Sequence, residues 1–386
     1  MNRRDFLKVG GMATLSLIGK GCIANDTYLS HLSKIFGKDF SIDGKKLAIA
    51  PYQIGLCSGY EFEKVVLAYA TLENSKGENN KLKFSSNIKV KKVDEIIYNN
   101  LTLHFLNISN LNPGKQYHYE IQNTPIKGLV RTSPIKLDKF NFVFVSDTQN
   151  EYSNNYLNQV KSDLAKLISK ENPNFLINGG DVTENSKVTE YLYNFFPSYT
   201  KLLLNTPLYV TKGNHDIRND GFDNFFGYKV GVPGMPIVNT LATNYSFDYS
   251  HVHFTILDSN NNLKSARQFL EEDLKISNGL FNIVVMHHPF RIPTTDLPVD
   301  AVFAGHLHTY RRFKDKNNIP YVICGGGGGK LYDEDKDFWI YNGKPLNEVL
   351  KLHEHHYISL DVKLNKIDVN MINKNGILRD KFSIRG

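Results

Sequence analysis

The sequence predicts an α/β protein whose helix-containing part is preceded by a small all-β sandwich domain. Short apolar runs rich in β-branched residues, such as residues 142–145 and 283–286, do not alternate with polar residues and so indicate strands buried on both faces. Segments with helical periodicity separate these runs, which is typical of βαβ units. Upstream, residues 46–136 alternate between apolar and polar side chains without a helical period, which indicates a small antiparallel sandwich.

The local patterns place the elements in chain order. Strands of the all-β domain are expected at residues 65–70, 88–93, 101–105 and 117–121. In the helix-containing part, apolar residues at helical spacing predict helices over residues 156–168, 191–204 (with a break near Pro197) and 266–274. A strand pair is expected at residues 245–249 and 251–257, and two more strands in the tail, residues 366–384.

Length and composition indicate about two domains. The chain has 386 residues, of which 41% are hydrophobic, and can therefore bury a large core. We expect an export signal over residues 1–24, a linker over 25–45, a β-sandwich over 46–136 and the α/β domain over 137–386. Three cysteines are too few for a disulfide framework. The densest basic cluster, residues 81–92, alternates with apolar residues and indicates a solvated strand face rather than a nucleic-acid-binding patch.

The N-terminus has the pattern of an export signal. Arg3 and Arg4 precede a mildly apolar stretch, residues 9–18, that is too short to be a transmembrane helix. The pattern resembles a twin-arginine signal, which implies bacterial export in the folded state to the periplasm or cell envelope. Cleavage after Ala24 and lipid anchoring of the chain to the membrane through Cys22 both remain open, as does an uncleaved amphipathic terminus.

Polar residues of metal-ligand type follow five of the predicted buried strands. In chain order they are Asp147 and Gln149, then Asp181, then Asn214, His215 and Asp216, then His287 with a spare neighbour, His288, and finally His306 and His308. In open α/β sheets ligands bind beyond the carboxyl ends of the strands, so these side chains should converge in space. Their number exceeds what one ion needs, and a shared carboxylate could bridge two ions about 3.5–4 Å apart. The mixture of carboxylate, amide oxygen and imidazole suits Fe, Mn or Zn rather than a thiolate-rich zinc site.

The order of these motifs resembles the calcineurin-like metallophosphoesterase superfamily over residues 139–386. The motifs are Asp147-x-Gln149, Gly179-Gly180-Asp181, Gly213-Asn214-His215-Asp216, His287-x-Pro289 and Gly305-His306-x-His308. The resemblance implies a metallophosphoesterase β-sandwich flanked by helices. It also implies two metal ions, the first held by Asp147, Gln149, Asp181 and His308, the second by Asp181, Asn214, His287 and His306. Many family members have His where Gln149 stands, and an amide oxygen is a harder, neutral ligand.

A second resemblance concerns the all-β domain. Residues 111–117 and 130–134 resemble the end of a fibronectin-III-like domain, which in purple-acid-phosphatase-like proteins precedes the catalytic domain. Purple acid phosphatases carry a tyrosine ligand three residues after the bridging aspartate. That position is Glu184 here, so we expect the purple charge-transfer colour to be missing.

These resemblances imply hydrolysis of phosphate esters by a hydroxide that bridges two metal ions. His215, positioned by Asn214 and Asp216, would be the acid that protonates the leaving oxygen, so we predict His215 and Asp216 as catalytic residues. No Ser or Cys nucleophile elbow is evident, and no phosphoenzyme is expected. The alternative is a cell-envelope binding or structural protein with a vestigial metal site, against which the complete ligand set argues.

Other histidines and glycines receive different interpretations. His251 and His253 alternate with apolar residues and are expected to be sheet residues. The cluster at residues 353–356 is expected at a solvated rim rather than around a third metal ion. The five glycines of residues 325–329 permit close backbone approach, and they lack the Lys-Ser/Thr of a phosphate-binding P-loop.

Overall fold

The computed structural model describes residues 41–42, 45–54, 65–72, 82–84, 88–98, 101–121, 126–151, 153–226, 229–231, 238–240, 244–332, 340–341 and 344–385. The predicted export signal, with Arg3, Arg4 and Cys22, and most of the predicted linker lie outside these residues. Within them, no helix is long and apolar enough to cross a membrane.

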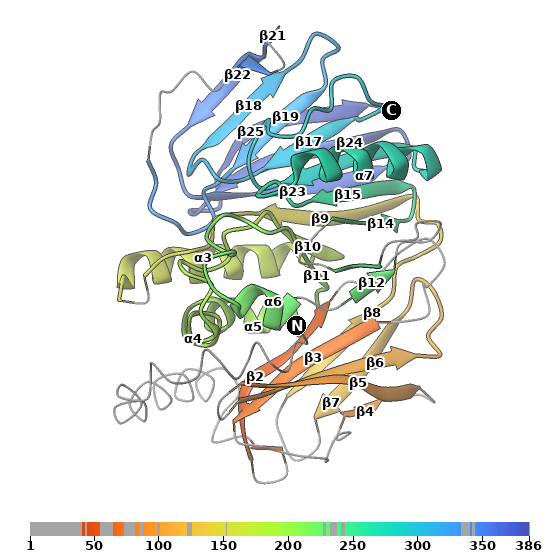
Figure 1. The fold of residues 1–386 in the computed structure, drawn as a ribbon, viewed down its shortest axis with the longest axis vertical. Coiled ribbons are helices and arrows are strands. Elements are labelled where there is room, and N and C mark those ends of the chain that lie inside the picture. Colours follow the sequence, from red (N-terminus) through yellow and green to blue (C-terminus); the bar gives the residue numbers. More distant parts are fainter. Residues whose placement is uncertain are drawn as a thin grey trace.

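Two sheets form the centre of the molecule (Figure 1). The first has eleven strands, ten of them in the order β25 (Leu378–Arg385), β24 (Lys366–Asn373), β23 (His356–Lys363), β9 (Lys139–Val145), β10 (Phe175–Asn178), β11 (Leu208–Val210), β2 (Lys45–Ile54), β3 (Val65–Leu72), β6 (Leu101–Ser109) and β5 (Lys89–Tyr98), with β1 (Ser41–Ile42) beside β2. Strands β9, β10 and β11 run parallel, so their carboxyl ends lie at one edge.

The second sheet has seven strands. Their order is β14 (Tyr245–Tyr249), β15 (Val252–Leu257), β16 (Phe281–Met286), β17 (Ala301–Ala304), β19 (Pro320–Cys324), β18 (Tyr310–Lys314) and β22 (Asn347–Leu352). Strands β15, β16, β17 and β19 run parallel. Two short pairs, β12 (Lys229–Gly231) with β13 (Val238–Thr240) and β20 (Ile340–Tyr341) with β21 (Lys344–Pro345), complete the described strands outside the N-terminal region.

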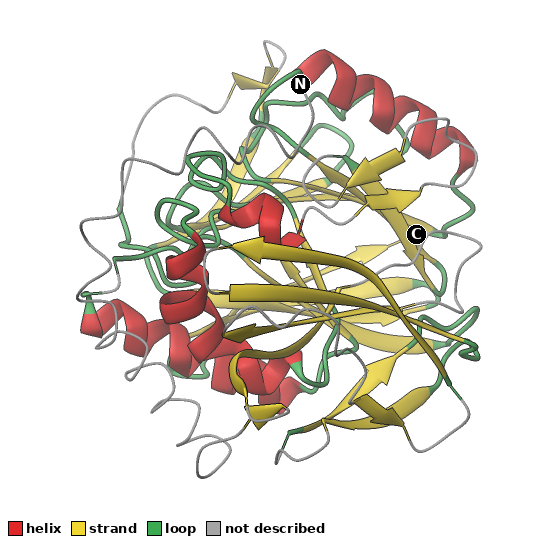
Figure 2. Cartoon of the chain, turned by 60° about the horizontal axis from the view of Figure 1, so that its bottom comes forward, coloured by secondary structure: helices red, strands yellow, loops and turns green. Residues whose placement is uncertain are grey.

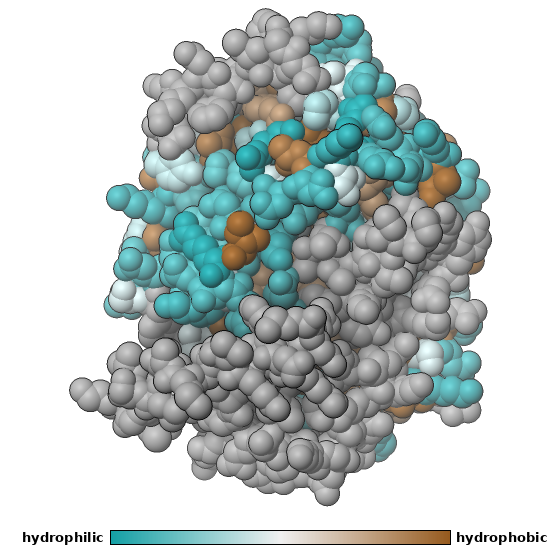
Figure 3. Space-filling view, viewed as in Figure 1, coloured by the Kyte–Doolittle hydropathy of each residue, from teal (hydrophilic) through white to brown (hydrophobic). Residues whose placement is uncertain are grey.

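The two sheets pack face to face, as the resemblance predicted, around an aromatic core. The ring of Phe175 from β10 stacks on Phe142 at 4.9 Å and meets the edge of Phe254 from β15 at 5.5 Å between centroids. Apolar burial of this kind is the main favourable contribution to folding. Figure 3 shows that the described surface on one face is mainly hydrophilic, with small separate hydrophobic patches.

Helices cover the outer faces of the sandwich. They are α3 (Asn155–Glu171), α4 (Val188–Glu190), the π-helix η2 (Tyr191–Phe195), α5 (Phe196–Leu203), α6 (Gly221–Phe226) and α7 (Leu263–Ile276). The three expected helices are confirmed. The break expected near Pro197 is also found, where η2 ends and α5 begins. Because α5 continues directly from η2, Pro197 interrupts the hydrogen-bond ladder inside one helical segment, and the π-helical turn lies directly before it.

The all-β region predicted at the N-terminal side is present. Strands β2, β3, β6 and β5 face a three-stranded sheet of β4 (Leu82–Phe84), β7 (Gln116–Ile121) and β8 (Lys127–Arg131). A separate core with Leu67, Leu106 and Tyr119 lies between them. Figure 1 places these strands at one end of the molecule, and Figure 2, in which that end comes forward, shows the helices at their periphery.

This region is joined to the α/β part by a shared sheet. Strand β2 pairs in parallel with β11 at Ile54 and Leu208. The Tyr119 hydroxyl donates to the carbonyl oxygen of Leu204 at 3.1 Å, and Arg131 donates to the carbonyl oxygen of Pro173 at 3.1 Å. The predicted domain boundary at residues 136–137 stays a prediction.

Candidate metal centre

The carboxylates of the centre stand on sharp turns directly after their strands. Asp147 follows β9 and Asp181 follows β10, and both have left-handed backbone angles, with φ of 58° and 52°. His306, after β17, has φ of 71°. Such angles are uncommon for residues other than glycine, and clusters of them are found at functional sites. A Cβ atom on Gly213 would collide with the Asp181 carboxylate, which explains the glycine before Asn214.

One set of donor atoms surrounds the amide oxygen of Asn214. Its Oδ1 lies 2.9 Å from Nδ1 of His306 and 3.2 Å from Nε2 of His287. Oδ2 of Asp181 lies 3.2 Å from the same Nε2. Ligand bonds of about 2.0–2.2 Å place neighbouring donor atoms about 3 Å apart. These four side chains therefore fit one metal ion, and they are the set that the resemblance assigns to the second ion.

The other donor atoms, which the resemblance assigns to the first ion, lie around His308. Its Nε2 lies 3.5 Å from Oδ1 of Asp147 and 2.9 Å from the carboxamide of Gln149. With its oxygen facing His308, the Gln149 carboxamide donates from nitrogen to the carbonyl oxygens of Asp147 (3.3 Å) and Asp181 (3.0 Å). Because these two hydrogen bonds use the amide nitrogen, the amide oxygen is the atom left to coordinate a cation. Donor atoms of Asp147, Asp181 and His287 lie within 4.8 Å of one another, so the two sets are continuous.

Backbone carbonyl groups fix the orientation of the imidazoles. Nδ1 of His287 donates to Gly179 O at 2.9 Å, and Nδ1 of His308 donates to Lys330 O at 2.6 Å. Each bond turns Nε2 toward the centre, and Nε2 is the atom that binds a metal ion once it is deprotonated. The Asp147 carboxylate accepts the amide N–H of His306 at 2.9 Å. The ligand residues therefore position one another.

The charges of the cluster perturb its proton equilibria. Burial would lower the pKa of His287, but the negative charge of Asp181 raises it to about 9. Burial and the nearby charge of His287 lower the pKa of His306 to about 4. Burial opposes ionisation of Asp181, but the charges of His287 and His215 hold its pKa below the ordinary value. The Asp181 carboxylate therefore remains ionised and available to cations.

His215 lies at the centre but outside both donor sets. Nδ1 of its ring donates to Glu184 O at 2.7 Å and lies 3.3 Å from the Glu184 carboxylate. Its Nε2 lies 3.9 Å from Oδ2 of Asp181 and 3.1 Å from the Arg218 guanidinium. Although burial lowers the pKa of His215, the hydrogen bond to Glu184 and the charge of Asp181 raise it above the usual value. Glu184 and Arg218 belong to the site, and no motif pointed to this contact.

Asp216 binds the backbone of the turns that carry the ligands. Its fully buried carboxylate accepts amide N–H groups from Asp181 at 2.7 Å, Gly213 at 2.9 Å and Val182 at 3.0 Å. Its oxygen atoms are thus used by the backbone of two strand-end turns. Within the described residues it makes no hydrogen bond to the His215 ring. Asp216 thus positions the turn that carries Asp181, and its assignment as a catalytic residue stays a prediction.

Two further side chains support the centre without having been predicted to do so. The ring centroid of His288 lies 4.4 Å from that of His306, and Nδ1 of His288 lies 3.1 Å from the Ser259 hydroxyl. Lys161, fully buried on α3, donates to Thr148 O at 3.2 Å, between two ligand residues. Burial lowers the pKa of Lys161 to about 7.

The glycine run and the histidine cluster meet beneath the ligands. The amides of Gly327 and Gly329 donate to Ser146 O at 2.9 Å and Asp147 O at 2.8 Å, so the predicted close backbone approach is confirmed. A Cβ on Gly329 would lie 2.7 Å from the His308 ring. The solvated position expected for residues 353–356 was wrong for His355 and His356, which are 5% and 0% exposed, because the glycine run packs over them.

Sequence comparison agrees with the geometry. Residues 140–310 match the family model of calcineurin-like phosphoesterases. Purple acid phosphatase 21 of Arabidopsis thaliana is 27% identical over 271 residues, which cover 60% of each chain. Purple acid phosphatase 23 of the same plant is 29% identical over 171 residues, 36% of this chain and 37% of the relative. The chain thus spans less than two thirds of the length of these relatives.

Solved structures show the same fold. The purple acid phosphatase PPD1 from yellow lupin (Lupinus luteus) seeds superposes with a TM-score of 0.68 at 14% identity. The superposition covers 87% of this chain and 74% of the PPD1 chain. PhoD superposes with a TM-score of 0.60 at 12% identity, and the superposition covers 88% of this chain and 90% of the PhoD chain. All the predicted site residues fall within residues 140–310, the segment that matches the family model of calcineurin-like phosphoesterases.

Proposed function

We propose that the protein hydrolyses phosphate esters with two ions of Fe, Mn or Zn held at this centre. The observation that carries the proposal is the convergence of seven side chains from five strand ends, with the Asp181 carboxylate within 4.8 Å of donor atoms of both Asp147 and His287. When bound, such ions neutralise charge on a phosphoryl group and activate water. The chain's own contribution is to hold the donor atoms about 3 Å apart before any ion binds.

His215 supplies the acid in this proposal. Its Nδ1 is committed to Glu184, so Nε2 is the atom available to give a proton to the leaving oxygen. The Arg218 guanidinium at 3.1 Å adds positive charge beside Nε2 and favours an anionic substrate. The Glu184 carboxylate, 3.5 Å from Arg218, fixes this arrangement and is engaged outside the donor sets.

The test is metal content combined with a panel of phosphate monoesters and diesters, assayed with each added metal. The purified protein should bind up to two ions per chain and hydrolyse at least one ester only when loaded. Asp181→Asn should weaken both ions together, because the Asp181 carboxylate lies within 4.8 Å of donor atoms of both Asp147 and His287. The cell-envelope binding or structural alternative would be supported by a protein that binds no transition metal, or that binds metal and hydrolyses no ester.

We further propose that the protein is exported to the bacterial cell envelope. The support is the pair Arg3 and Arg4 before a short apolar stretch. Replacing both arginines with lysine should leave the precursor in the cytoplasm, as followed by cell fractionation. Unchanged export of the double variant would contradict this route, and detergent partitioning of Cys22→Ala separates lipid anchoring from cleavage after Ala24.

A further inference from the structure

Helix α3 carries a fully buried lysine, Lys161, that the mechanism above does not use. Three oxygen atoms surround its ammonium group. They are the carbonyl oxygen of Thr148 at 3.2 Å, the side-chain oxygen of Asn150 at 2.6 Å and the side-chain oxygen of Asn194. Because an ammonium group has three N–H donors, each donor has one acceptor here.

The burial of Lys161 is costly, because all three of these acceptors are neutral. Proteins usually offset the removal of an ammonium group from water by a carboxylate partner. Among the described residues, the carboxylate of Glu190 acts on Lys161 only from a greater distance, and it accepts the N–H groups of Asn185 instead. The three hydrogen bonds of Lys161 therefore supply what an apolar side chain of similar length could not.

Two of the three acceptors flank Gln149, a predicted ligand of the first ion. The Thr148 carbonyl group and the Gln149 N–H group belong to one planar peptide unit. Lys161 binds the carbonyl oxygen of this unit, and its N–H donates to the carbonyl oxygen of Asp181 at 3.0 Å. On the other side of Gln149, Lys161 binds the side chain of Asn150. Lys161 therefore holds both neighbours of this ligand.

The third acceptor connects the ligand loop to the π-helical turn η2. Asn194 of η2 accepts a hydrogen bond from Lys161 and donates from its amide nitrogen to the carbonyl oxygen of Asn150 at 2.7 Å. Single π-helical turns next to α-helices are frequent at functional sites. Lys161, Asn150 and Asn194 thus form a closed hydrogen-bond network beside the loop that carries Asp147 and Gln149.

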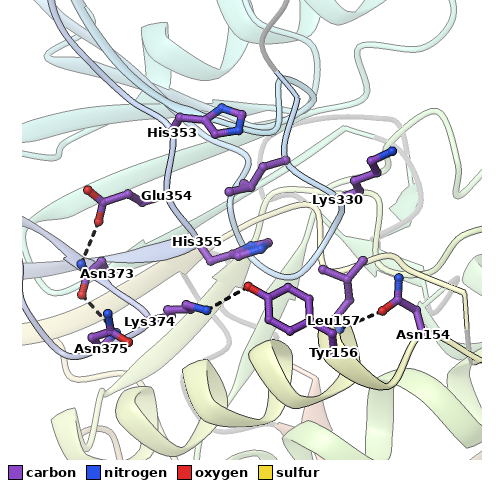
Figure 4. Close-up of a pocket in the computed structure, with 11 residues that line it drawn as sticks. Asn154, Tyr156, Leu157, Lys330, His353, Glu354, His355, Asn373, Lys374 and Asn375 are labelled. Carbon is purple, nitrogen blue, oxygen red and sulfur yellow. Dashed lines mark hydrogen bonds between the residues drawn. The ribbon is translucent and has the colours of Figure 1, made fainter.

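Helix α3 is itself anchored at its start, one turn before Lys161. The side chain of Asn154 caps the helix by accepting the N–H of Leu157 at 3.1 Å. Figure 4 shows this bond together with a second anchor, in which the Lys374 ammonium donates to the Tyr156 hydroxyl at 2.9 Å. Leu157 and Lys161 lie on the same buried face of α3. The helix therefore presents Lys161 to the ligand loop from a fixed position.

Gln149 depends on such support more than the carboxylate ligands do. Its carboxamide is neutral, so it attracts a cation less strongly than Asp147 or Asp181. Its oxygen can coordinate only in the orientation in which the nitrogen donates to the carbonyl oxygens of Asp147 and Asp181. A weak ligand contributes most when it is already in position, because binding then requires little further ordering.

We propose that Lys161 is the positioning residue of the first metal site: it fixes residues 148–150 so that the Gln149 amide oxygen faces the first ion. The inference rests on the two-ion centre of the proposed function, and it concerns only one of the two ions. The residues assigned to the second ion alone, Asn214, His287 and His306, form their described hydrogen bonds outside this network. The second ion should therefore not depend on Lys161.

The experiment measures Mn²⁺ binding by Lys161→Met, which keeps the length of the side chain and removes its donors. In equilibrium dialysis the first ion should bind about 10–100-fold more weakly than in wild type, the usual effect of losing a group that orients a ligand. The second ion should keep its dissociation constant. Electron paramagnetic resonance should then show isolated Mn²⁺ in place of a coupled pair. Lys166→Met, which removes an exposed ammonium group from the same helix, is the matched control and should bind both ions as wild type does.

A double-mutant cycle separates the positioning of Gln149 from general support of the fold. Gln149→Ala alone should also weaken the first ion. In that background Lys161→Met should add little, because the ligand that Lys161 positions is no longer present. Asn194→Ala removes one partner of Lys161 and should weaken the first ion in the same direction. It decides the question if Lys161→Met does not fold, as checked by circular dichroism.

The outcomes distinguish this inference from the proposed function. A wild-type protein that binds neither Mn²⁺ nor another transition metal would overturn the two-ion centre itself. Wild-type binding of both ions by the folded Lys161→Met variant would overturn the positioning role alone. So would an equal loss of both ions, or additive effects of Lys161→Met and Gln149→Ala, because each would show that Lys161 does not act through Gln149.

Discussion

Two histidines of the centre, His215 and His306, have different partners. Nδ1 of His306 lies 2.9 Å from the Asn214 oxygen within a donor set, whereas the ring of His215 is held by Glu184. His215→Ala should therefore keep both metal ions and lose about 10²–10⁴-fold in turnover, the usual range for a positioned acid. Metal content and steady-state rates measure the two effects.

The matched control is His306→Ala, which should lose metal and activity toward every ester alike. For His215→Ala the loss should be greatest with alkoxide leaving groups, which need a proton, and smallest with nitrophenolate, which leaves as an anion. Loss of metal from His215→Ala, or an equal defect for good and poor leaving groups, would show that His215 is a ligand or a fold-supporting residue.

Site residues in local sequence patterns could be predicted, whereas contacts between distant loops could not. Asp147, Asp181 and His308 were predicted because a ligand at a strand end is recognisable from a local pattern. The contact between Glu184 and His215 joins two loops 31 residues apart, and no local period encodes it. The contacts of Asp216 could not be predicted either, because a motif gives proximity in sequence and does not say which backbone amides a carboxylate accepts.

At the scale of elements, a buried network joins α7 to the hairpin of β14 and β15. His253 of β15 lies 2.7 Å from the Asp248 carboxylate and 2.9 Å from that of Asp273 on α7. Asp273 also accepts the hydroxyls of Ser246 at 2.6 Å and Thr255 at 2.6 Å. The prediction that His253 is a sheet residue is confirmed, and the burial of its charge is offset by two carboxylates.

This network makes a pH-dependent contribution to stability. Burial lowers the pKa of His253, but hydrogen bonds to Asp248 and Asp273 raise it to about 9. Because this exceeds the unfolded value of about 6.5, the stabilisation is fully present below pH 6.5 and is lost as pH rises through about 9. Urea unfolding should show the free energy of unfolding falling by about 2–3 kcal/mol over this window.

His253→Gln is the comparison for this effect, since it keeps a polar side chain but cannot titrate. Its free energy of unfolding should be lower at pH 6 and should change less between pH 6.5 and pH 9. His251→Gln changes a histidine two residues earlier that lies near Lys363 O rather than between carboxylates, and it should retain the wild-type slope. Equal slopes in wild type and His253→Gln would contradict the assignment.

The elements themselves were more predictable than their long-range pairing. Helices α3 and α7 follow from apolar residues at helical spacing, and the break before α5 follows from Pro197. The parallel pairing of β2 with β11, at Ile54 and Leu208, joins segments far apart in the chain, and alternation within one strand says nothing about its partner. The two regions were therefore predicted as separate units, whereas they share a sheet.

At the scale of the whole molecule, the shared sheet couples the N-terminal strands to the metal centre. Strand β11 ends in the turn to Asn214, and its other neighbour besides β10 is β2, which continues to β3 and β6. Hydrogen bonds from Tyr119 to Leu204 and from Arg131 to Pro173 reinforce the junction. A ligand that binds only the folded state stabilises every element that unfolds with its site.

Metal loading should therefore protect strands β3 and β6, although neither touches the centre. Ion at 1,000 times its dissociation constant stabilises the folded state by about 4 kcal/mol. Hydrogen exchange measured by mass spectrometry should show slower exchange in β3 and β6 on loading, together with β9 to β11. Arg131→Leu removes the donor to Pro173 and should weaken this transfer of protection to the N-terminal strands. Protection confined to the α/β part in wild type would contradict the coupling and would support two independently unfolding domains that meet near residue 136.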